Sequence, residues 1–296
     1  MRHMLALKYI DMVAKSGSIR SASEMLAITP SALNRRILAI EEELGIEIFE
    51  RHAAGVRLNS AGELFIQHIR SQMADLERVR SRIADLSGVR MGRVRIAVTQ
   101  EIGVGLLPKL IQNYRAEFPG VTFSITTCQR NELERRLQNL EADIAVAFQP
   151  ANLADVHTLL HRAQPLHIVV ASAHPLAKRK EVRLVDCLEE GALLPRRGDG
   201  IRELVEAAAV RKGLDCSPMV EAEDHHYLRE ITRSGGGVMF SCPLIDGEQP
   251  MDGLKSVPLV SGEIENGFLF VCQLRNRTLP VAVGKFVDEL RKSIGD

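Results

Sequence analysis

One stretch near the N-terminus, from Ser18 to Gly62, constrains the fold more than any other part of the 296-residue chain. Its first part predicts two short helices separated by a tight turn. At the start of the second helix, the Thr29 side chain can accept from free backbone N–H groups, and Pro30 takes the first helical position, where a missing N–H costs nothing. The pattern therefore predicts a helix-turn-helix whose second helix begins at a fixed residue.

The second helix is expected to present a polar face opposite an apolar one. Ser31, Asn34 and Arg35 recur at a spacing of three to four residues. Small polar and basic side chains near a helix start suit insertion into the major groove of DNA. The candidate DNA-binding residues of the helix pair are Ser18, Arg20, Ser21, Thr29, Pro30, Ser31, Asn34, Arg35 and Arg36. A helix pair also occurs in ordinary helical domains, so this motif alone leaves a purely structural role open.

The residues that follow favour DNA binding. Residues 44–58 have the pattern of a short turn and a two-stranded wing, which carries Arg51, His52 and Arg57. Basic side chains on a wing contact the sugar-phosphate backbone, where they position a protein without reading the base sequence. We therefore predict a winged helix-turn-helix domain over residues 1–59, with Arg51 and Arg57 among its DNA-binding residues.

These residues resemble the LysR-type transcriptional regulators. The resemblance rests on the helix pair, on the block from Leu44-Gly45 to Leu58 and on Ser60-Ala61-Gly62, and it continues more weakly to the C-terminus. It implies a winged helix-turn-helix, a long dimerisation helix and a two-lobed effector domain similar to periplasmic binding proteins. Two positions depart from the family pattern: Asn34 replaces a common serine, and the loop Thr127-Cys128-Gln129-Arg130 lacks the usual Gly or Ser.

Length and charge agree with such an organisation. A chain of 296 residues exceeds one ordinary domain. No apolar run approaches the roughly 20 residues of a membrane span, and no signal-peptide pattern is present, so a cytoplasmic protein without membrane contact is expected. Residues 1–95 carry 15 basic and 11 acidic side chains, a net of +4, and the remainder carries −4. The positive excess lies beside the predicted contact with double-stranded DNA, which should be salt-sensitive.

Residues 60–92 are predicted to form a long helix followed by a hinge at Gly88–Gly92. Apolar side chains recur at intervals of mostly three and four, as in a coiled-coil seam. The candidate dimerisation residues are Phe65, Ile69, Met73, Leu76 and Ile83. We favour a homodimer that holds two recognition helices one DNA turn, or a multiple of it, apart; the resemblance extends this to a homotetramer. The alternative is a helix packed on its own domain.

From residue 93 onward, strand and helix patterns alternate, which predicts an α/β domain with parallel sheets. The expected strands are 94–98, 121–126, 143–148, 166–171, 219–221, 237–241 and 267–273. The expected helices are 104–118, 131–140, 201–212, 225–234 and 281–292. The resemblance implies that lobe I comprises residues 93–163 and 267–296 and that lobe II comprises residues 164–266.

Ligands of open α/β sheets bind beyond the carboxyl ends of strands, where helix N-termini offer backbone donors to anions. This rule selects four loops, at residues 99–101, 127–129, 196–200 and 223–225. The candidate effector-binding residues are Thr99, Gln100, Thr127, Gln129, Phe148, Arg196, Asp199, Gly200 and His225. Thr99 and Asp199 can equally be plain helix caps. Arg196 or Arg197 could grip a carboxylate through two parallel bonds, so a small organic acid is the expected effector.

The five cysteines are odd in number, widely spaced and without a C-x-x-C, so neither a disulfide framework nor zinc is predicted. Cys242 and Cys272 are expected in the core. Cys128 lies in a loop before a helix start, where a thiolate would be stabilised, which leaves a redox-sensing regulator open. Adjacent His225 and His226 seldom ligate one metal together.

No arrangement of a nucleophile with a base and an orienting group is recognisable, so we expect no enzyme, no metal and no cofactor. The leading hypothesis is a sequence-specific DNA-binding transcriptional regulator controlled by a small organic anion bound between two lobes. The alternative is a small-molecule binding protein whose N-terminal module serves assembly.

Overall fold

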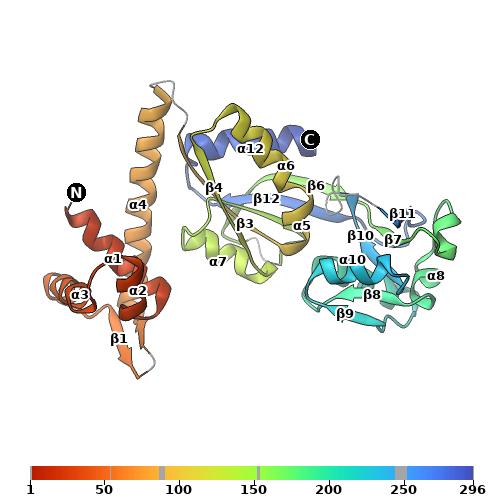
Figure 1. Cartoon of the computed structure of the whole chain (residues 1–296), viewed down its shortest axis with the longest axis horizontal. Coiled ribbons are helices and arrows are strands. Elements are labelled where there is room, and N and C mark those ends of the chain that lie inside the picture. Colours follow the sequence, from red (N-terminus) through yellow and green to blue (C-terminus); the bar gives the residue numbers. More distant parts are fainter. Residues whose placement is uncertain (1, 54, 87–90, 152–153, 244–251, 296) are drawn as a thin grey trace. The chain divides into compact units, whose positions relative to one another are not determined.

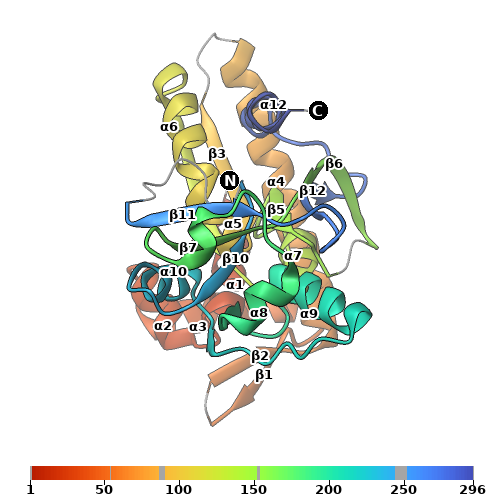
Figure 2. The ribbon, with the colours of Figure 1, turned by 90° about the vertical axis from the view of Figure 1, so that its right-hand side faces the viewer.

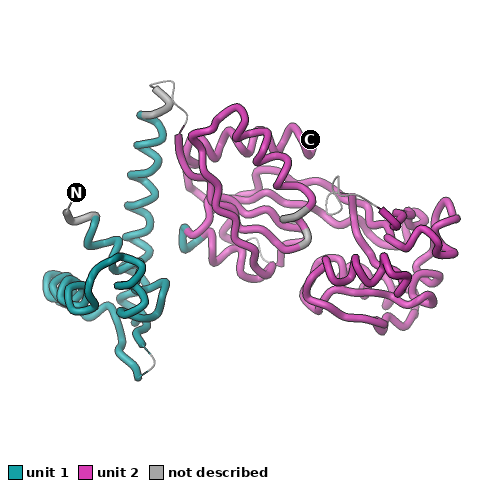
Figure 3. The backbone as a smooth tube through the Cα atoms, viewed as in Figure 1, with its two compact units in different colours: residues 1–83, 138–140 teal, residues 84–137, 141–296 magenta. Residues whose placement is uncertain are grey.

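The computed structural model describes residues 2–53, 55–86, 91–151, 154–243 and 252–295. The chain divides into two compact units, residues 1–83 with 138–140 and residues 84–137 with 141–296 (Figure 3). Across the described residues, no helix has the length and apolar character needed to cross a bilayer.

The first unit contains short helices, a two-stranded wing and one long helix (Figures 1 and 2). Their bounds are α1 (Arg2–Ser16), α2 (Ile19–Met25), α3 (Pro30–Leu44), β1 (Phe49–His52), β2 (Gly55–Leu58) and α4 (Ser60–Leu86). The α3 helix ends where Gly45 adopts a left-handed conformation, with φ of 70°. The strands β1 and β2 pair antiparallel. The predicted helix-turn-helix, the wing and the helix opened by Ser60 are confirmed.

One apolar core joins the three N-terminal helices, the wing and the first half of α4. It contains Leu7, Ile10, Val13, Leu33, Ile37, Ile48, Phe49, Ile66 and Ile69. Gly62 lets α4 approach the wing, because a Cβ at this position would lie 2.1 Å from the carbonyl oxygen of Ile48. Buried Asp11 then ties α1 to α4 by accepting from Arg70 at 2.8 Å. The first half of α4 is therefore an integral part of this domain.

The character of α4 changes along its length. Ile69 is fully buried and Phe65 and Met73 pack against the same core, whereas Val79 and Ile83 are 49% and 59% exposed. The prediction of an intermolecular seam is therefore wrong for Ile69, which packs inside its own chain. Helical periodicity identifies an apolar face but does not say which partner covers it.

The hinge predicted at Gly88–Gly92 lies largely outside the described residues. Gly92 itself begins the first strand of the second unit, β3 (Gly92–Val98).

Among the described residues, the second unit contains two five-stranded sheets, with the orders β4-β3-β5-β12-β6 and β11-β7-β10-β8-β9 (Figures 1 and 2). The remaining strand bounds are β4 (Val121–Thr127), β5 (Ile144–Phe148), β6 (Val156–Gln164), β7 (His167–Ala171), β8 (Ala192–Pro195), β9 (Val220–Ala222), β10 (Val238–Ser241), β11 (Leu254–Pro258) and β12 (Gly267–Leu274). The chain passes between the sheets after β6 and returns before β12. We call the part around the first sheet lobe I and the part around the second lobe II.

Helices cover both faces of each sheet. Their bounds are α5 (Gln100–Gly105), α6 (Leu107–Glu117), η1 (Arg130–Glu132), α7 (Leu133–Gln138), η2 (Pro175–Lys178), α8 (Leu184–Glu189), α9 (Gly200–Lys212), α10 (His225–Arg233) and α12 (Val281–Ile294). Alternate residues of β3 enter different cores: Ile96 and Val98 pack in the core that contains α6 and α12, whereas Ala97 packs with Leu133 of α7. In lobe II, Leu228 of α10 and Val205 of α9 are likewise in separate cores.

The expectation of purely parallel sheets needs correction. The strand β3 runs parallel to β4 and β5, and β8 runs parallel to β9 and β10. However, β12 is antiparallel to β5 and β6, and β7 is antiparallel to β10 and β11. These antiparallel strands lie next to the two connections by which the chain passes from one sheet to the other. Parallel neighbours need a helical crossover between them, and these connections contain none. The sequence prediction missed β6, β8, β11 and α8, and its helix over residues 104–118 covers α6 but only the end of α5.

Candidate functional site

Hydroxyl groups fix the starts of both helices in the helix-turn-helix. The Ser18 side chain accepts from the backbone N–H of Ser21 at 3.3 Å, and the Thr29 side chain accepts from that of Ala32 at 3.3 Å. Pro30 follows Thr29 at the first turn of α3, as the sequence predicts. The N-terminal turn of α3 is therefore held by local capping bonds.

The polar face of α3 is accessible. Ser31 and Arg35 are exposed, and Asn34 is half-buried. The Asn34 side-chain oxygen accepts from Arg51 of the wing at 2.9 Å, which fixes Arg51 beside the helix. Arg35 on α3 and Arg57 on β2 are exposed, and neither forms an ion pair within the described part of the chain. These two guanidinium groups are available to an external anion such as a phosphate.

Two other predicted DNA-binding arginines have intramolecular partners. The Arg36 guanidinium lies 4.8 Å from the ring centre of the buried Tyr9, a cation–π contact that joins α3 to α1. Arg20 lies 3.5 Å from Glu24 on the same helix, and both side chains are exposed.

In lobe I, the predicted effector residues divide into a buried and an exposed group. The Thr99 side chain is 1% exposed and accepts from the backbone N–H of Phe148 at 3.4 Å, so it joins the ends of β3 and β5. It makes no capping bond to α5. Thr127 and Gln129 are exposed, and Gln100 is half-buried. The last three side chains are accessible to a ligand.

In lobe II, the predicted residues largely bond to one another. Asp199 caps α9 by accepting from the N–H of Ile201 at 2.8 Å, and its second oxygen lies 2.9 Å from Nε2 of His225. The exposed Arg196 forms an ion pair with Glu223 at 3.3 Å. The capping role that the sequence left open for Asp199 is therefore present, and Glu223 neutralises part of the charge that Arg196 brings to this loop.

The two lobes touch around Phe148. A Cβ on Gly200 would lie 3.0 Å from this ring and 2.9 Å from Cβ of Gln149, and a Cβ on Gly267 would lie 2.0 Å from the ring. Phe148 is fully buried and its ring fills the space between two glycines; its role as the floor of a ligand pocket stays a prediction. Gln149 has φ of 47°, an uncommon left-handed conformation for a residue with a side chain.

Arg130 is a site residue that sequence reasoning missed. It lies in η1 of lobe I and is 8% exposed, yet its Nη1 reaches lobe II. There it donates to the carbonyl oxygen of Gly198 at 3.2 Å and pairs with Glu203 of α9 at 2.9 Å. Its Nε is buried and has no hydrogen-bond partner among the described residues. The available signal was a basic residue in a loop that joins a strand end to a helix start.

The cysteines divide by burial. Cys242 and Cys272 are buried, as predicted, and so is Cys187. Burial raises the pKa of Cys187 to about 12 and that of Cys272 to about 11, so these thiols stay protonated at neutral pH. Cys128 is half-buried beside the core of α7.

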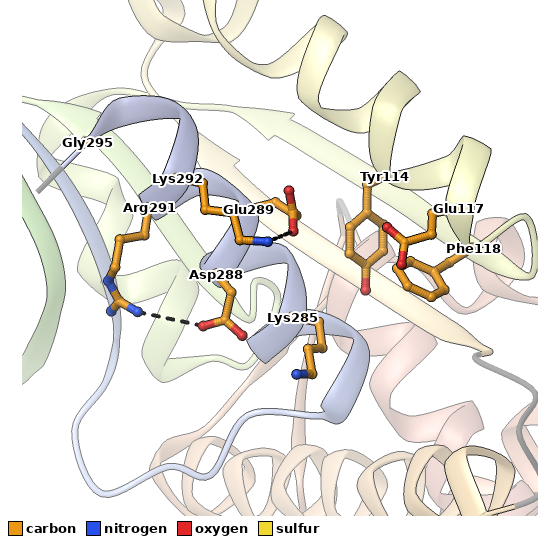
Figure 4. Close-up of a pocket in the computed structure, with 9 residues that line it drawn as sticks. All are labelled: Tyr114, Glu117, Phe118, Lys285, Asp288, Glu289, Arg291, Lys292 and Gly295. Atoms are coloured by element: carbon orange, nitrogen blue, oxygen red, sulfur yellow. Dashed lines mark hydrogen bonds and ion pairs between the residues drawn. The ribbon is translucent and has the colours of Figure 1, made fainter.

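A cavity of about 880 Å³ lies between α6 and α12 (Figure 4). Its lining includes Tyr114 of α6 and Phe118, which directly follows that helix, but none of the predicted effector residues. Four of its charged residues pair along α12, where Lys292 lies 2.6 Å from Glu289 and Arg291 lies 3.6 Å from Asp288. Elsewhere in the described residues, no group of three or more His, Cys, Asp or Glu side chains lies close enough to hold a metal ion.

Comparison with known proteins matches both units of the chain to one protein family. Residues 4–63 match the bacterial regulatory helix-turn-helix proteins of the lysR family, and residues 87–295 match the LysR substrate binding domain. The transcriptional activator CmpR of Synechocystis sp. is 22% identical over 278 residues, which cover 94% of this chain and 91% of CmpR.

Two solved structures have the same fold. A full-length OxyR variant from Pseudomonas aeruginosa superposes with a TM-score of 0.76 at 20% identity, covering 97% of this chain and 94% of OxyR. Full-length CbnR in complex with its target DNA gives a TM-score of 0.67 at 19% identity, covering 98% of this chain and 99% of CbnR. The match of the LysR domain to more than half of the chain, together with the helix-turn-helix match, shows that the protein belongs to the LysR family of DNA-binding transcriptional regulators and carries an effector-binding domain.

Proposed function

We propose that this regulator responds to a small organic anion that binds where lobes I and II meet. The observation that carries the proposal is Arg130, a guanidinium that is 8% exposed, spans both lobes and keeps one buried N–H group without a partner among the described residues. A buried cation with an unused donor favours an anionic ligand, because a carboxylate supplies both the charge and the acceptor.

The groups around Arg130 suit the rest of a small polar ligand. Thr127 and Gln129, in the same loop, are exposed and supply neutral hydrogen bonds. On the lobe II side, the N-terminus of α9 begins at Gly200 and brings the partial positive charge of a helix start. The remaining candidates for ligand contact are Gln100, Arg196 and His225. We propose that the other predicted residues, Thr99, Phe148 and Asp199, hold the loops in place through their own contacts.

An anion held by residues of both lobes would change the balance between lobe arrangements. A ligand shifts such an equilibrium only if it binds one arrangement better than the other. Because Arg130 and Thr127 belong to lobe I and α9 to lobe II, a bound anion favours the arrangement that brings these groups together. This shift in lobe arrangement would alter DNA binding by changing the spacing of the two recognition helices in the dimer.

For the DNA contact, we propose that Ser31, Asn34 and Arg35 of α3 face the base edges in the major groove. Arg57 and Arg51 of the wing, together with Ser18, Arg20, Ser21 and Arg36 of the helix pair, would face the phosphates. The support is the exposure of α3 and the absence of ion pairs at Arg35 and Arg57 within the described residues.

The proposed dimer forms through the second half of α4. Leu76 is half-buried, and Val79 and Ile83 are exposed apolar side chains beyond the domain core. We expect Ile83→Asp to convert the dimer to monomers in light scattering coupled to size exclusion. Met25→Asp, at an apolar position of the same unit that is 66% exposed, is the matched control. A dimer that survives Ile83→Asp unchanged would contradict this interface.

The effector proposal is tested by thermal unfolding of the full-length protein against a panel of mono-, di- and tricarboxylic acids. A ligand of the folded state raises the unfolding midpoint as its concentration rises. We expect a saturable rise that is lost in Arg130→Gln, weakened in Thr127→Val and retained in Arg115→Gln, which removes an exposed charge from α6. A flat response of the wild-type protein to every acid would rule out an organic anion of this class.

A further inference from the structure

We propose that Arg130 and Glu203 form a latch between the lobes, and that the effector anion opens it by replacing the Glu203 carboxylate on Arg130. The inference rests on the proposed function, because it describes how the same anion site is regulated. Without ligand, Glu203 is the counter-charge of Arg130; with ligand, the anion takes that place.

The latch joins elements that are distant in the chain. Arg130 begins η1, which follows the short loop after β4 in lobe I, and Glu203 lies in the first turn of α9 in lobe II. The ion pair measures 2.9 Å, and the same Nη1 donates to the Gly198 carbonyl oxygen at 3.2 Å. One guanidinium therefore connects the lobes both through a carboxylate and through the backbone of the loop before α9.

The two partners are buried to very different extents. The Arg130 side chain is 8% exposed, whereas that of Glu203 is 55% exposed. A buried charge needs a counter-charge, because leaving it uncompensated is strongly unfavourable. An exposed carboxylate, in contrast, regains its hydration when it leaves. Glu203 is therefore the exchangeable partner and Arg130 the fixed one.

A ligand carboxylate can satisfy Arg130 better than Glu203 does. Glu203 pairs with Nη1, and the buried Nε has no hydrogen-bond partner among the described residues. A planar carboxylate that approaches the Nε side accepts two parallel bonds, from Nε–H and Nη2–H, and its negative charge beside the same guanidinium weakens the pair between Nη1 and Glu203. The incoming anion therefore gains a bond that the resident carboxylate does not make.

The neighbouring acids are committed elsewhere, which leaves Glu203 as the competitor. Asp199 caps α9 and contacts His225 at 2.9 Å. Glu206, one turn after Glu203 on α9, accepts from the buried Arg202 at 2.7 Å. Removing the Glu203 charge should thus leave these contacts in place while freeing Arg130.

The test is calorimetric titration of the full-length protein with succinate, citrate and benzoate as probes. Wild type, Glu203→Gln, Arg130→Gln and the double variant are compared, with Glu181→Gln as an exposed-charge control. We expect Glu203→Gln to bind a carboxylate about tenfold more tightly, as expected when one charge-assisted competitor is removed. Arg130→Gln and the double variant should lose this binding, and Glu181→Gln should bind like wild type.

A second measurement follows the ligand-free protein. The thermal midpoints of the four latch proteins form a double-mutant cycle, and a latch requires the two substitutions to be non-additive. If wild type binds a carboxylate but Glu203→Gln binds it no more tightly, the latch is overturned and the proposed function stands. If no protein, including Glu203→Gln, binds any probe, both the latch and the organic-anion proposal fail.

Discussion

Arginine side chains of the two compact units lie in contrasting environments at the positions that matter most for their proposed roles. In the N-terminal unit, Arg35 and Arg57 are exposed and form no ion pair within the described residues. In the effector domain, Arg130, Arg202 and Arg277 have side chains that are 8%, 4% and 11% exposed, and each is bonded to a carboxylate. The same residue type is thus exposed at Arg35 and Arg57, whereas in the effector domain it ties elements together, as Arg70 also does in the N-terminal unit through Asp11.

The difference follows from the cost of desolvating a charge. An exposed guanidinium keeps its hydration until it meets a phosphate, and binding then releases counterions from the DNA. A buried guanidinium must be paired at all times, so its position is tied to the fold. The charge distribution agrees, since residues 1–95 carry a net of +4 and the rest −4. Burial, more than residue type, separates the arginines proposed to contact DNA from the structural ones.

The largest expected effect is on the buried network around Asp143 in lobe I. Its side chain is 1% exposed and accepts from Arg95 and from Arg277, at 2.7 Å in each case. Asp143→Asn would leave two guanidinium groups without their shared counter-charge. We expect the free energy of unfolding of the effector domain to fall by about 3–5 kcal/mol, as measured by urea unfolding monitored by circular dichroism.

Glu181→Gln serves as the control for Asp143→Asn, because it removes one negative charge from an exposed position. Its unfolding free energy should stay within about 0.5 kcal/mol of wild type. Equal stabilities for Asp143→Asn and wild type would mean that the buried arginines of this domain do not depend on their partners.

The next effect concerns the exposed arginines of the N-terminal unit. Arg35→Ala should weaken binding to the cognate DNA site by about 1–3 kcal/mol and relax the base preference, as expected for a base-edge contact. Arg57→Ala should weaken binding to all sequences alike and lower the salt dependence by about one counterion. Fluorescence anisotropy at several salt concentrations measures both quantities.

Lys255→Ala is the matched control for the DNA titrations, since it removes an exposed positive charge from β11 of the effector domain. Its affinity for DNA should equal that of wild type. Wild-type affinity in both Arg35→Ala and Arg57→Ala would remove these residues from the interface.

A smaller effect is expected at Arg36, which adjoins Arg35 on α3. Its guanidinium lies over the Tyr9 ring at 4.8 Å. Arg36→Met keeps the aliphatic stem and removes the cation, so the N-terminal domain should lose about 0.5–1 kcal/mol of stability. Thermal unfolding measures this loss. If Arg36→Met instead weakens DNA binding as much as Arg35→Ala with no change in stability, Arg36 belongs with the outward-facing arginines.

Sequence reasoning succeeded where local chemistry decides the structure. The start of α3 depends on Thr29 and Pro30, which act within one helical turn, and both have the predicted roles. The wing likewise follows from a short segment with Gly55 at the start of β2. The same local logic predicted that Asp199 stands at the start of α9, although it left open whether this residue caps the helix or binds a ligand.

It failed where a distant part of the chain decides. Ile69 belongs to a correct apolar stripe, but α1 and the wing, not a second chain, cover it. Arg130 gains its importance from Gly198 and Glu203, which topology alone brings to η1. The strand β6 was missed because its burial does not alternate regularly, and its pairing with β12 shifts register at Val271/Cys272. Period-two patterns are weak predictors of such strands.

The smallest expected effect concerns an acid that fastens lobe II. Glu263 accepts from the backbone N–H of Leu184 at 2.7 Å and from Lys212 at 3.0 Å. Burial alone would raise its pKa, but the bonds from Leu184 and Lys212 outweigh it and hold the pKa below the ordinary value. A lowered pKa in the folded state means that the stabilisation is complete above the unfolded pKa of about 4.3 and is lost as pH falls through the folded value.

Glu263→Gln should therefore be less stable than wild type at neutral pH, and the gap should close as the pH falls below about 4. Thermal unfolding of both proteins between neutral and acidic pH measures this gap, with Glu181→Gln as the reference for loss of an exposed carboxylate. If the stability difference between wild type and Glu263→Gln stays constant or grows in acid, Glu263 stabilises lobe II through its shape and not through its charge. In that case the contrast between the two units would rest on the buried arginines alone.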